Sequence, residues 1–257
     1  MMKHFRLSSA VLILFMAAVS LHAEENTNEN NATAPMESGQ FLSKSVINDQ
    51  FIKPASLKDF IHQIAVFAAF EPMFILNTEA GTKSAPSPVV YPLSIGISWP
   101  DYYFVSFQPR MSFYYNYYLW NNDEQTALPA EVENRTATAL SCLFTLPAVF
   151  SFHFTDKTMF EAEAGVSFLL RTGILSNGVS GTDSGTSGSA ESDTELINKW
   201  FWTGLRFLYA ETGVSWLFDF TAVKAGPELH FYLPIGSLLD NRGLDAMMLS
   251  GGIKLIF

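Results

Sequence analysis

A long alternation between apolar and polar side chains constrains this chain more than any other feature. In residues 102–119 the odd positions are apolar or aromatic, and most even positions are polar. A period of two places each set on its own face of a β-strand. The alternation far exceeds the usual strand of about five or six residues, whereas a membrane-crossing strand needs about 9–11. The odd set is Tyr103, Val105, Phe107, Pro109, Met111, Phe113, Tyr115, Tyr117 and Leu119, and the even set includes Ser106, Gln108, Arg110, Ser112 and Asn116. Because Pro109 has no N–H group, we expect a local irregularity such as a bulge there.

The same alternation recurs along the chain from about residue 60. It is clear in residues 159–172, 222–233 and 247–257, and weaker in about 61–76, 88–99 and 136–154. In each clear segment one face is apolar and the other carries polar or charged residues and glycine. This texture is typical of strands that have an apolar surrounding on one side only.

Short and long connections alternate between these segments. The short ones are Pro100-Asp101, Asp156-Lys157 and Asp219–Thr221, and the long ones are about 77–87, 120–134, 173–195 and 234–246. The third long link is rich in Gly, Ser and Thr and is expected to be mobile. Outer-membrane barrels have short periplasmic turns and long extracellular loops, whereas a soluble sandwich has no reason to sort its connections in this way. The pattern predicts an all-β fold, a closed antiparallel up-and-down transmembrane β-barrel of about eight strands.

One region does not fit a single regular strand. In residues 195–219 Arg206 indicates that even positions face inward, whereas Val214, Trp216 and Phe218 indicate that even positions face outward. A strand with a bulge near Tyr209–Gly213 accounts for the change of phase, and this is the interpretation that we favour. A short helix over Glu195–Tyr209, followed by a strand from Thr212, is the alternative.

The N-terminus has the parts of a secretory signal peptide. Lys3 and Arg6 precede an apolar run, Leu7 to Val19, that is too short to span a bilayer. We therefore expect residues 1–23 to be a cleaved signal peptide, although the cleavage site stays open. The polar residues 24–58 are expected to form a flexible periplasmic leader, and residues 59–257 the barrel.

Composition excludes several classes of protein. Charged residues make up 16% of the chain, against about 25% in an ordinary soluble domain. No run of about 18 apolar residues follows the N-terminus, which argues against a helical membrane protein. Without residues 1–23 the chain keeps 13 basic and 25 acidic residues, a net charge of −12, so binding to nucleic acid is not expected. Cys142 is the only cysteine and cannot form an intramolecular disulfide.

The polar face of the predicted strands would point into the barrel. Eight strands leave an interior just wide enough for side chains, and unpaired buried charge is costly. We expect opposite charges there to pair in a structural network, with Glu161 and Glu163 meeting Arg110 or Arg171; a selective path for a small solute is the alternative. The predicted interior residues are Gln108, Arg110, Glu161, Glu163, Arg171, Lys224, Glu228, His230 and Lys254.

The sequence favours a protein that is not an enzyme. His153 and His230 are both expected inside the barrel, and neither lies near a nucleophile motif. No zinc-protease, Walker or dinucleotide motif occurs, so no metal, cofactor or catalytic residue is predicted. Aromatic residues are expected at the membrane interfaces, including Trp99 near a periplasmic turn and Tyr115, Tyr117 and Trp120 near an outer loop.

The C-terminus carries a resemblance to a known class. Alternating apolar residues lead to a terminal Phe257, which looks like the final strand that the bacterial barrel-assembly machinery recognises. With the signal peptide and the other strands, the chain resembles small outer-membrane barrels of the OmpA, OmpX and OmpW type, and is similar to spirochaete (treponemal) barrels. The resemblance implies the bacterial outer membrane, contact with its lipid, and possible surface ligands held by the loops.

Four functions stay open on the sequence alone. The first is a structural or surface-interaction barrel that acts through its loops. The second is a narrow channel or carrier for small or hydrophobic solutes, as the OmpW resemblance implies. The third is a barrel enzyme. The fourth is a secreted soluble β-sandwich that binds a ligand.

Overall fold

The computed structural model describes residues 64–77, 87–99, 105–130, 137–240 and 242–257. All of the described helices and strands lie in one compact unit, Pro54–Ile256. The predicted signal peptide, the predicted leader and the Pro100-Asp101 turn lie outside the described residues. Within the described part of the chain, no helix is both long enough and apolar enough to cross a membrane.

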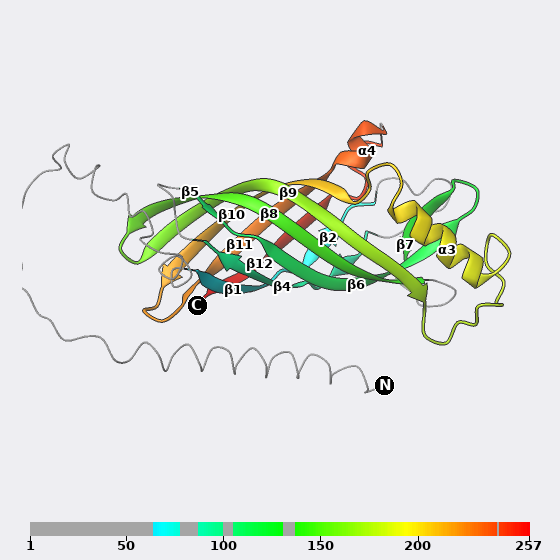
Figure 1. The fold of residues 1–257 in the computed structure, drawn as a ribbon, viewed down its shortest axis with the longest axis horizontal. Coiled ribbons are helices and arrows are strands. Elements are labelled where there is room, and N and C mark those ends of the chain that lie inside the picture. Colours follow the sequence, from blue (N-terminus) through cyan, green and yellow to red (C-terminus); the bar gives the residue numbers. More distant parts are fainter. Residues whose placement is uncertain (1–63, 78–86, 100–104, 131–136, 241) are drawn as a thin grey trace, which may run out of the picture. The chain divides into compact units, whose positions relative to one another are not determined.

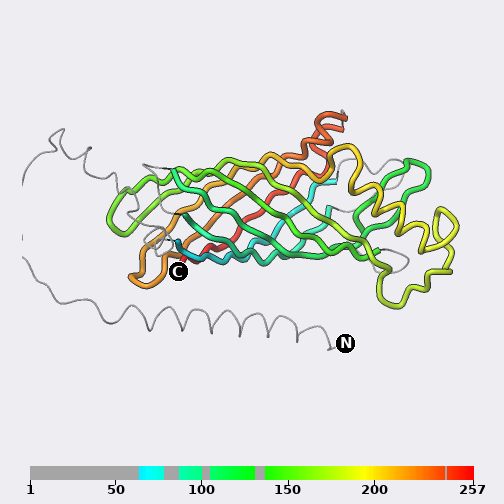
Figure 2. Tube along the Cα trace, in the orientation of Figure 1, coloured from blue at the N-terminus to red at the C-terminus, as the bar shows by residue number. Residues whose placement is uncertain are grey.

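Eight antiparallel strands pair in a ring (Figure 1). Their order around the ring is the order of the sequence, and the last strand pairs back with the first through Phe67↔Ile256 and Phe70↔Ile253. Figure 2 shows these strands running side by side and obliquely. The ring strands are β1 (Ala65–Phe70), β4 (Leu93–Ser98), β6 (Arg110–Asn121), β8 (Ala137–Thr155), β9 (Thr158–Leu175), β10 (Leu208–Asp219), β11 (Lys224–Pro234) and β12 (Met248–Ile256). The predicted antiparallel all-β sheet is thus confirmed.

Four short strands bring the sheet to twelve. Proline accounts for three of them, because a residue without an N–H group interrupts a ladder. Pro72 separates β1 from β2 (Met73–Ile75), Pro92 separates β3 (Val89–Val90) from β4, and Pro109 separates β5 (Val105–Phe107) from β6. The fourth, β7 (Thr126–Ala130), folds back on β6 as a hairpin, so the predicted link 120–134 is partly a strand. The irregularity expected at Pro109 is therefore present as a break in the strand.

Two of the long connections contain helices. The favoured interpretation of residues 195–219 as one bulged strand is wrong, because α3 (Ala190–Phe201) precedes β10. The alternative, a short helix followed by a strand, is confirmed, although α3 begins and ends before the predicted helix Glu195–Tyr209. α4 (Ile235–Leu239) follows β11. Figure 1 shows α3, α4 and β7 at the same end of the ring, opposite the tight β8–β9 turn at Asp156-Lys157.

Local signals define α3, and polar contacts hold the segment before it. Ser189 caps the helix in a reciprocal pair of hydrogen bonds with Ser192, and Glu191 lies in the first turn; both features favour a helix start. The buried Asp193 carboxylate accepts hydrogen bonds from the backbone amides of Thr186 and Ser187, each at 2.8 Å. The Gly/Ser/Thr-rich link that was expected to be mobile is thus tied to α3 through its second half.

The two faces of the ring have opposite characters. Every ring strand turns at least one large apolar side chain outward, where it is exposed. Examples, strand by strand, are Phe70, Ile95, Phe113, Leu140, Leu170, Trp216, Phe231 and Ile253. The residues between them point inward and many of these are polar. In residues 105–119 the odd positions face outward and the even positions face inward, as predicted. Trp120, which was expected at a membrane interface, is instead buried, with 4% of its surface exposed.

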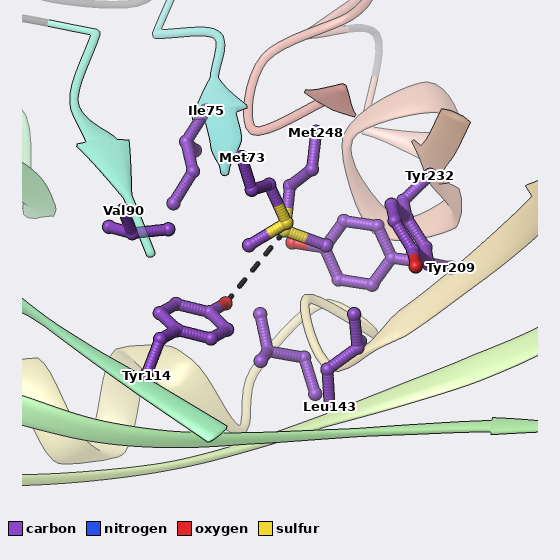
Figure 3. Close-up of a cluster of buried hydrophobic side chains, with 9 residues drawn as sticks. Met73, Ile75, Val90, Tyr114, Leu143, Tyr209, Tyr232 and Met248 are labelled. Carbon is purple, nitrogen blue, oxygen red and sulfur yellow. Dashed lines mark hydrogen bonds between the residues drawn. The ribbon is translucent and has the colours of Figure 1, made fainter. Parts of the chain in front are cut away.

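Successive layers of side chains fill the interior. Strand β9 passes through three of them: Met159 packs with Phe67 in a small apolar cluster, Glu161 and Glu163 follow in a charged layer, and Leu169 joins a larger apolar cluster. Figure 3 shows this larger cluster, in which the Tyr114 hydroxyl reaches the Met248 sulfur at 3.8 Å. Arg171 lies beyond it, under α3.

Candidate functional site

The charged layer is centred on Arg110, at the start of β6. The Nη2 atom of Arg110 donates hydrogen bonds to Glu163 on β9 at 2.8 Å and to Glu211 on β10 at 2.7 Å. Its Nη1 atom lies 3.5 Å from Glu71 and 3.8 Å from Glu228 on β11. All five side chains are almost completely buried. One arginine thus links residues from β6, β9, β10, β11 and the β1–β2 junction.

His230 on β11 lies against the same guanidinium and the same acids. Its Nδ1 atom faces Glu163 and, at 3.2 Å, Glu211. Its Nε2 atom lies 3.3 Å from Glu71 and 3.1 Å from Glu228. Both ring nitrogens also lie near the Arg110 guanidinium, so His230 sits between the arginine and the acids of the network. Among the described residues, no hydroxyl or thiol lies within hydrogen-bond distance of His230.

A second, smaller network lies next to the first. The Lys254 ammonium donates hydrogen bonds to Glu161 at 2.8 Å and to Gln108 at 2.5 Å. Glu161 also accepts hydrogen bonds from Gln108 at 3.0 Å and from Ser215 at 2.9 Å. The Lys254 ammonium lies 4.9 Å from the Phe67 ring centroid, in cation–π geometry. Lys254 and Glu161 therefore form a buried ion pair without net charge, and these hydrogen bonds join them to residues inside the ring.

The predicted interior residues divide into three groups in the structure. Seven of them join the two networks: Gln108, Arg110, Glu161, Glu163, Glu228, His230 and Lys254. Arg171 is buried but lies in another layer, and Lys224 is half-buried at the first position of β11, opposite Asp219. His153, which was expected inside, is exposed near the β8–β9 turn. Phe257 follows β12 and is half-buried.

Sequence reasoning missed Glu71 and Glu211. Glu211 was missed because the phase of residues 195–219 was assigned wrongly; extending the outward set Val214, Trp216 and Phe218 backward points Glu211 inward. Glu71 lies in a run of apolar residues, where an isolated acid is itself a signal. Glu71 keeps the alternation of its neighbours, because Ala69 and Met73 are also buried whereas Phe70 and Phe74 are exposed. The backbone beside it packs closely on Gly252, where a Cβ atom would lie 2.1 Å from the Phe70 carbonyl oxygen.

Two sets of donor atoms in the charged layer have spacings that suit a metal ion. Glu71, Glu228 and His230 form one set, and Glu163, Glu211 and His230 the other, with ligand atoms within 4.8 Å of one another. However, Arg110 lies 3.1 Å from Nε2 and 2.9 Å from Nδ1 of His230. A metal ion at either set would meet the positive guanidinium at close range, so the present geometry favours ion pairing over metal binding.

Comparisons with known proteins reveal only distant likenesses. No family model and no curated protein matches the sequence. Among solved structures, Ail, the attachment invasion locus protein of Yersinia pestis, in complex with the heparin analogue sucrose octasulfate, is 6% identical with a TM-score of 0.41, covering 76% of this chain and 97% of that one. Neisserial surface protein A (NspA) is 13% identical with a TM-score of 0.40, over 76% of this chain and 97% of its own. A likeness at this level assigns no function to the chain.

Proposed function

We propose that the chain is an exported outer-membrane β-barrel of a bacterium with a structural or surface-interaction role. The observation that carries the proposal is the reversal of the two faces, with exposed apolar side chains on all eight ring strands and buried charged networks inside. Soluble monomers rarely expose contiguous apolar patches larger than a few hundred Å². Exposed apolar side chains are unfavourable in water, and contact with the hydrocarbon core of a bilayer removes this free-energy cost.

Closure of the ring suits the same surrounding. Inside a bilayer no water is present to bond free backbone groups, so only helices and closed sheets span it. The β1–β12 pairing gives the first and last strands partners on both sides. The charged side chains meanwhile pair with one another inside, away from the apolar phase.

The filled interior favours a structural role over a channel. Along β9, the charged layer at Glu161 and Glu163 lies between the apolar layers of Met159 and Leu169. A solute would have to displace both apolar layers and break the ion pairs of Arg110. We therefore expect no conductance steps from the folded chain in planar bilayers, and steady open-channel currents would instead support the channel alternative.

The surface role is placed at the end of the ring that carries α3, α4 and β7. This end has the long connections, which in outer-membrane barrels face the outside, and a capped helix and a hairpin give it a defined shape. In the same proposal residues 1–23 are the cleaved signal, residues 24–58 the periplasmic leader, and Phe257 the signal read by the barrel-assembly machinery. The partners are membrane lipid and surface ligands of the loops, with no nucleic acid.

Epitope insertion in a Gram-negative host tests this orientation. One tag is placed between Asp123 and Glu124, in the exposed β6–β7 turn, and the matched tag between Asp156 and Lys157, in the exposed β8–β9 turn. Exposed loop tips tolerate insertion best. We expect antibody to bind the first tag on intact cells and the second only after permeabilisation. Binding of the second tag alone on intact cells, or of both or neither, would overturn the proposal.

A further inference from the structure

A recess opens between the larger apolar cluster and α3. It is partly open to one side, and its enclosed volume is about 30 Å³. The floor is apolar and aromatic, formed by Tyr114, Leu169, Tyr209 and Met248, and Figure 3 shows three of these side chains converging. Trp200 from α3 contributes to the wall. The recess therefore offers aromatic surfaces that a small organic molecule can contact from its open side.

Arg171 on β9 lines this recess and differs from the other buried cations. Its side chain is 4% exposed. Its guanidinium donates to the Tyr118 hydroxyl at 3.2 Å and to the Arg206 carbonyl at 3.0 Å, both neutral groups. Arg110 and Lys254 each contact carboxylates, whereas no carboxylate of a described residue lies within ion-pair distance of Arg171. A buried charge without a counter-charge is costly, so Arg171 is a candidate to hold an anion.

Unused hydrogen-bond donors on the lining support this interpretation. The Nε atom of Arg171, the Nε1 atom of Trp200 and the Oγ1 atom of Thr126 are all buried and have no hydrogen-bond partner within the described structure. All three residues line the recess. One face of the guanidinium lies 4.3 Å from the Phe201 ring centroid, in cation–π geometry, while the Nε–H group remains available. Buried donors are normally paired, and three unpaired donors on one recess indicate an acceptor.

We propose that the recess binds an organic monoanion, a carboxylate or sulfonate with a small aromatic or aliphatic body. Arg171 holds the anionic group, and the aromatic floor contacts the body. The other charged side chains of the lining, Arg242 and Asp245, have opposite signs, so the recess keeps a net charge of one positive unit. This inference goes beyond the proposed surface role, because it concerns a small molecule held under α3.

Calorimetric titration of the refolded full chain in zwitterionic detergent micelles tests the proposal. The probe is 2-naphthalenesulfonate, and its neutral counterpart is 2-naphthalenemethanol, each corrected by titration into protein-free micelles. We expect the sulfonate to bind at least tenfold more tightly than the alcohol, since a charge-assisted hydrogen bond is formed only with the anion. Equal affinity of the two probes would overturn the proposal without recourse to any variant.

Two variants assign the effect to Arg171. Arg171→Met is expected to weaken sulfonate binding at least tenfold and to leave the alcohol within twofold. Lys199→Met removes an equal charge from an exposed position of α3 and is expected to change sulfonate binding by less than twofold. An Arg171→Met variant that folds and binds the sulfonate as tightly as the native chain would overturn the assignment. Strong competition by inorganic sulfate alone would show that the apolar floor contributes nothing, contrary to the proposal.

Discussion

Replacing Arg110 by methionine tests whether the charged layer holds the ring together. Methionine keeps much of the side-chain length but removes the positive charge. The four carboxylates of Glu71, Glu163, Glu211 and Glu228 would then face His230 alone. The acids already outnumber the two bases, so no other described residue of this network can replace the lost charge.

The expected loss of stability is about 3–5 kcal/mol, the cost of removing one partner from a buried ion pair. The upper part of this range is expected because the two hydrogen bonds of Nη2, at 2.8 and 2.7 Å, are lost together. Adding Glu211→Gln to Arg110→Met removes one unpaired charge and is expected to recover about 1–2 kcal/mol. Lys224→Met, at a half-buried strand end without an ion pair to a described residue, is the control and should change stability by about 0.5 kcal/mol or less.

The assay is equilibrium unfolding by urea from phospholipid vesicles, followed by tryptophan fluorescence and by the shift in gel mobility between unheated and boiled samples. The free energy of unfolding is compared between the native chain and each variant. A loss below about 1 kcal/mol for Arg110→Met, within reach of the Lys224 control, would refute the reasoning that the charged layer is a structural element.

Three further predictions follow, two measured by the same unfolding assay and one by amide hydrogen exchange. Glu161→Gln is expected to cost about 2–4 kcal/mol because it leaves the buried lysine of its pair without a carboxylate. Glu228→Gln should cost about 1 kcal/mol or less, because Arg110 and His230 keep the carboxylates of Glu71, Glu163 and Glu211; equal losses would contradict this distinction. Gly252→Ala is expected to lower stability by more than about 2 kcal/mol, because the new Cβ atom would lie 2.1 Å from a backbone oxygen. In Gly251→Ala the nearest atom to the new Cβ is 3.6 Å away, so stability should change by about 0.5 kcal/mol or less. The opposite order would be incompatible with the packing. Asp193→Ala is expected to increase amide hydrogen exchange at Thr186 and Ser187 without lowering exchange protection in β9, and unchanged exchange at these two amides would show that the carboxylate does not hold the link.

The strands were predictable because each has one apolar face and one face with many polar residues. In residues 110–121 and 222–233 the alternation of side chains depends only on which face of the strand each position occupies, and this can be read at every position of the sequence. The breaks at Pro72, Pro92 and Pro109 follow from the missing N–H group. These local rules were sufficient to predict the strand count of the ring and the facing of Arg110 and Glu163.

The segment that contains α3 and part of the charged layer were not predictable in the same way. The segment before α3 lacks an apolar period, and polar contacts of Asp193 organise it, which depend on three-dimensional proximity. The inward position of Glu211 is hard to predict because Arg206 lies in the turn before β10, and a strand that includes Arg206 has the opposite phase. The exposed position of His153 reflects the end of β8, where the alternation of facing no longer holds.

The central claim is that one side of each ring strand meets lipid and the other meets a closed interior. Phe231 and Tyr232 are neighbours on β11, the first exposed at 40% and the second at 1%. 4-Fluorophenylalanine is incorporated at one position or the other, and ¹⁹F relaxation of the chain in bicelles is measured with a paramagnetic label on the lipid chains or dissolved in water. The account predicts strong relaxation by the lipid label at position 231, much weaker relaxation at 232, and little effect of the aqueous label at either. Relaxation at position 231 by the aqueous label alone would contradict it.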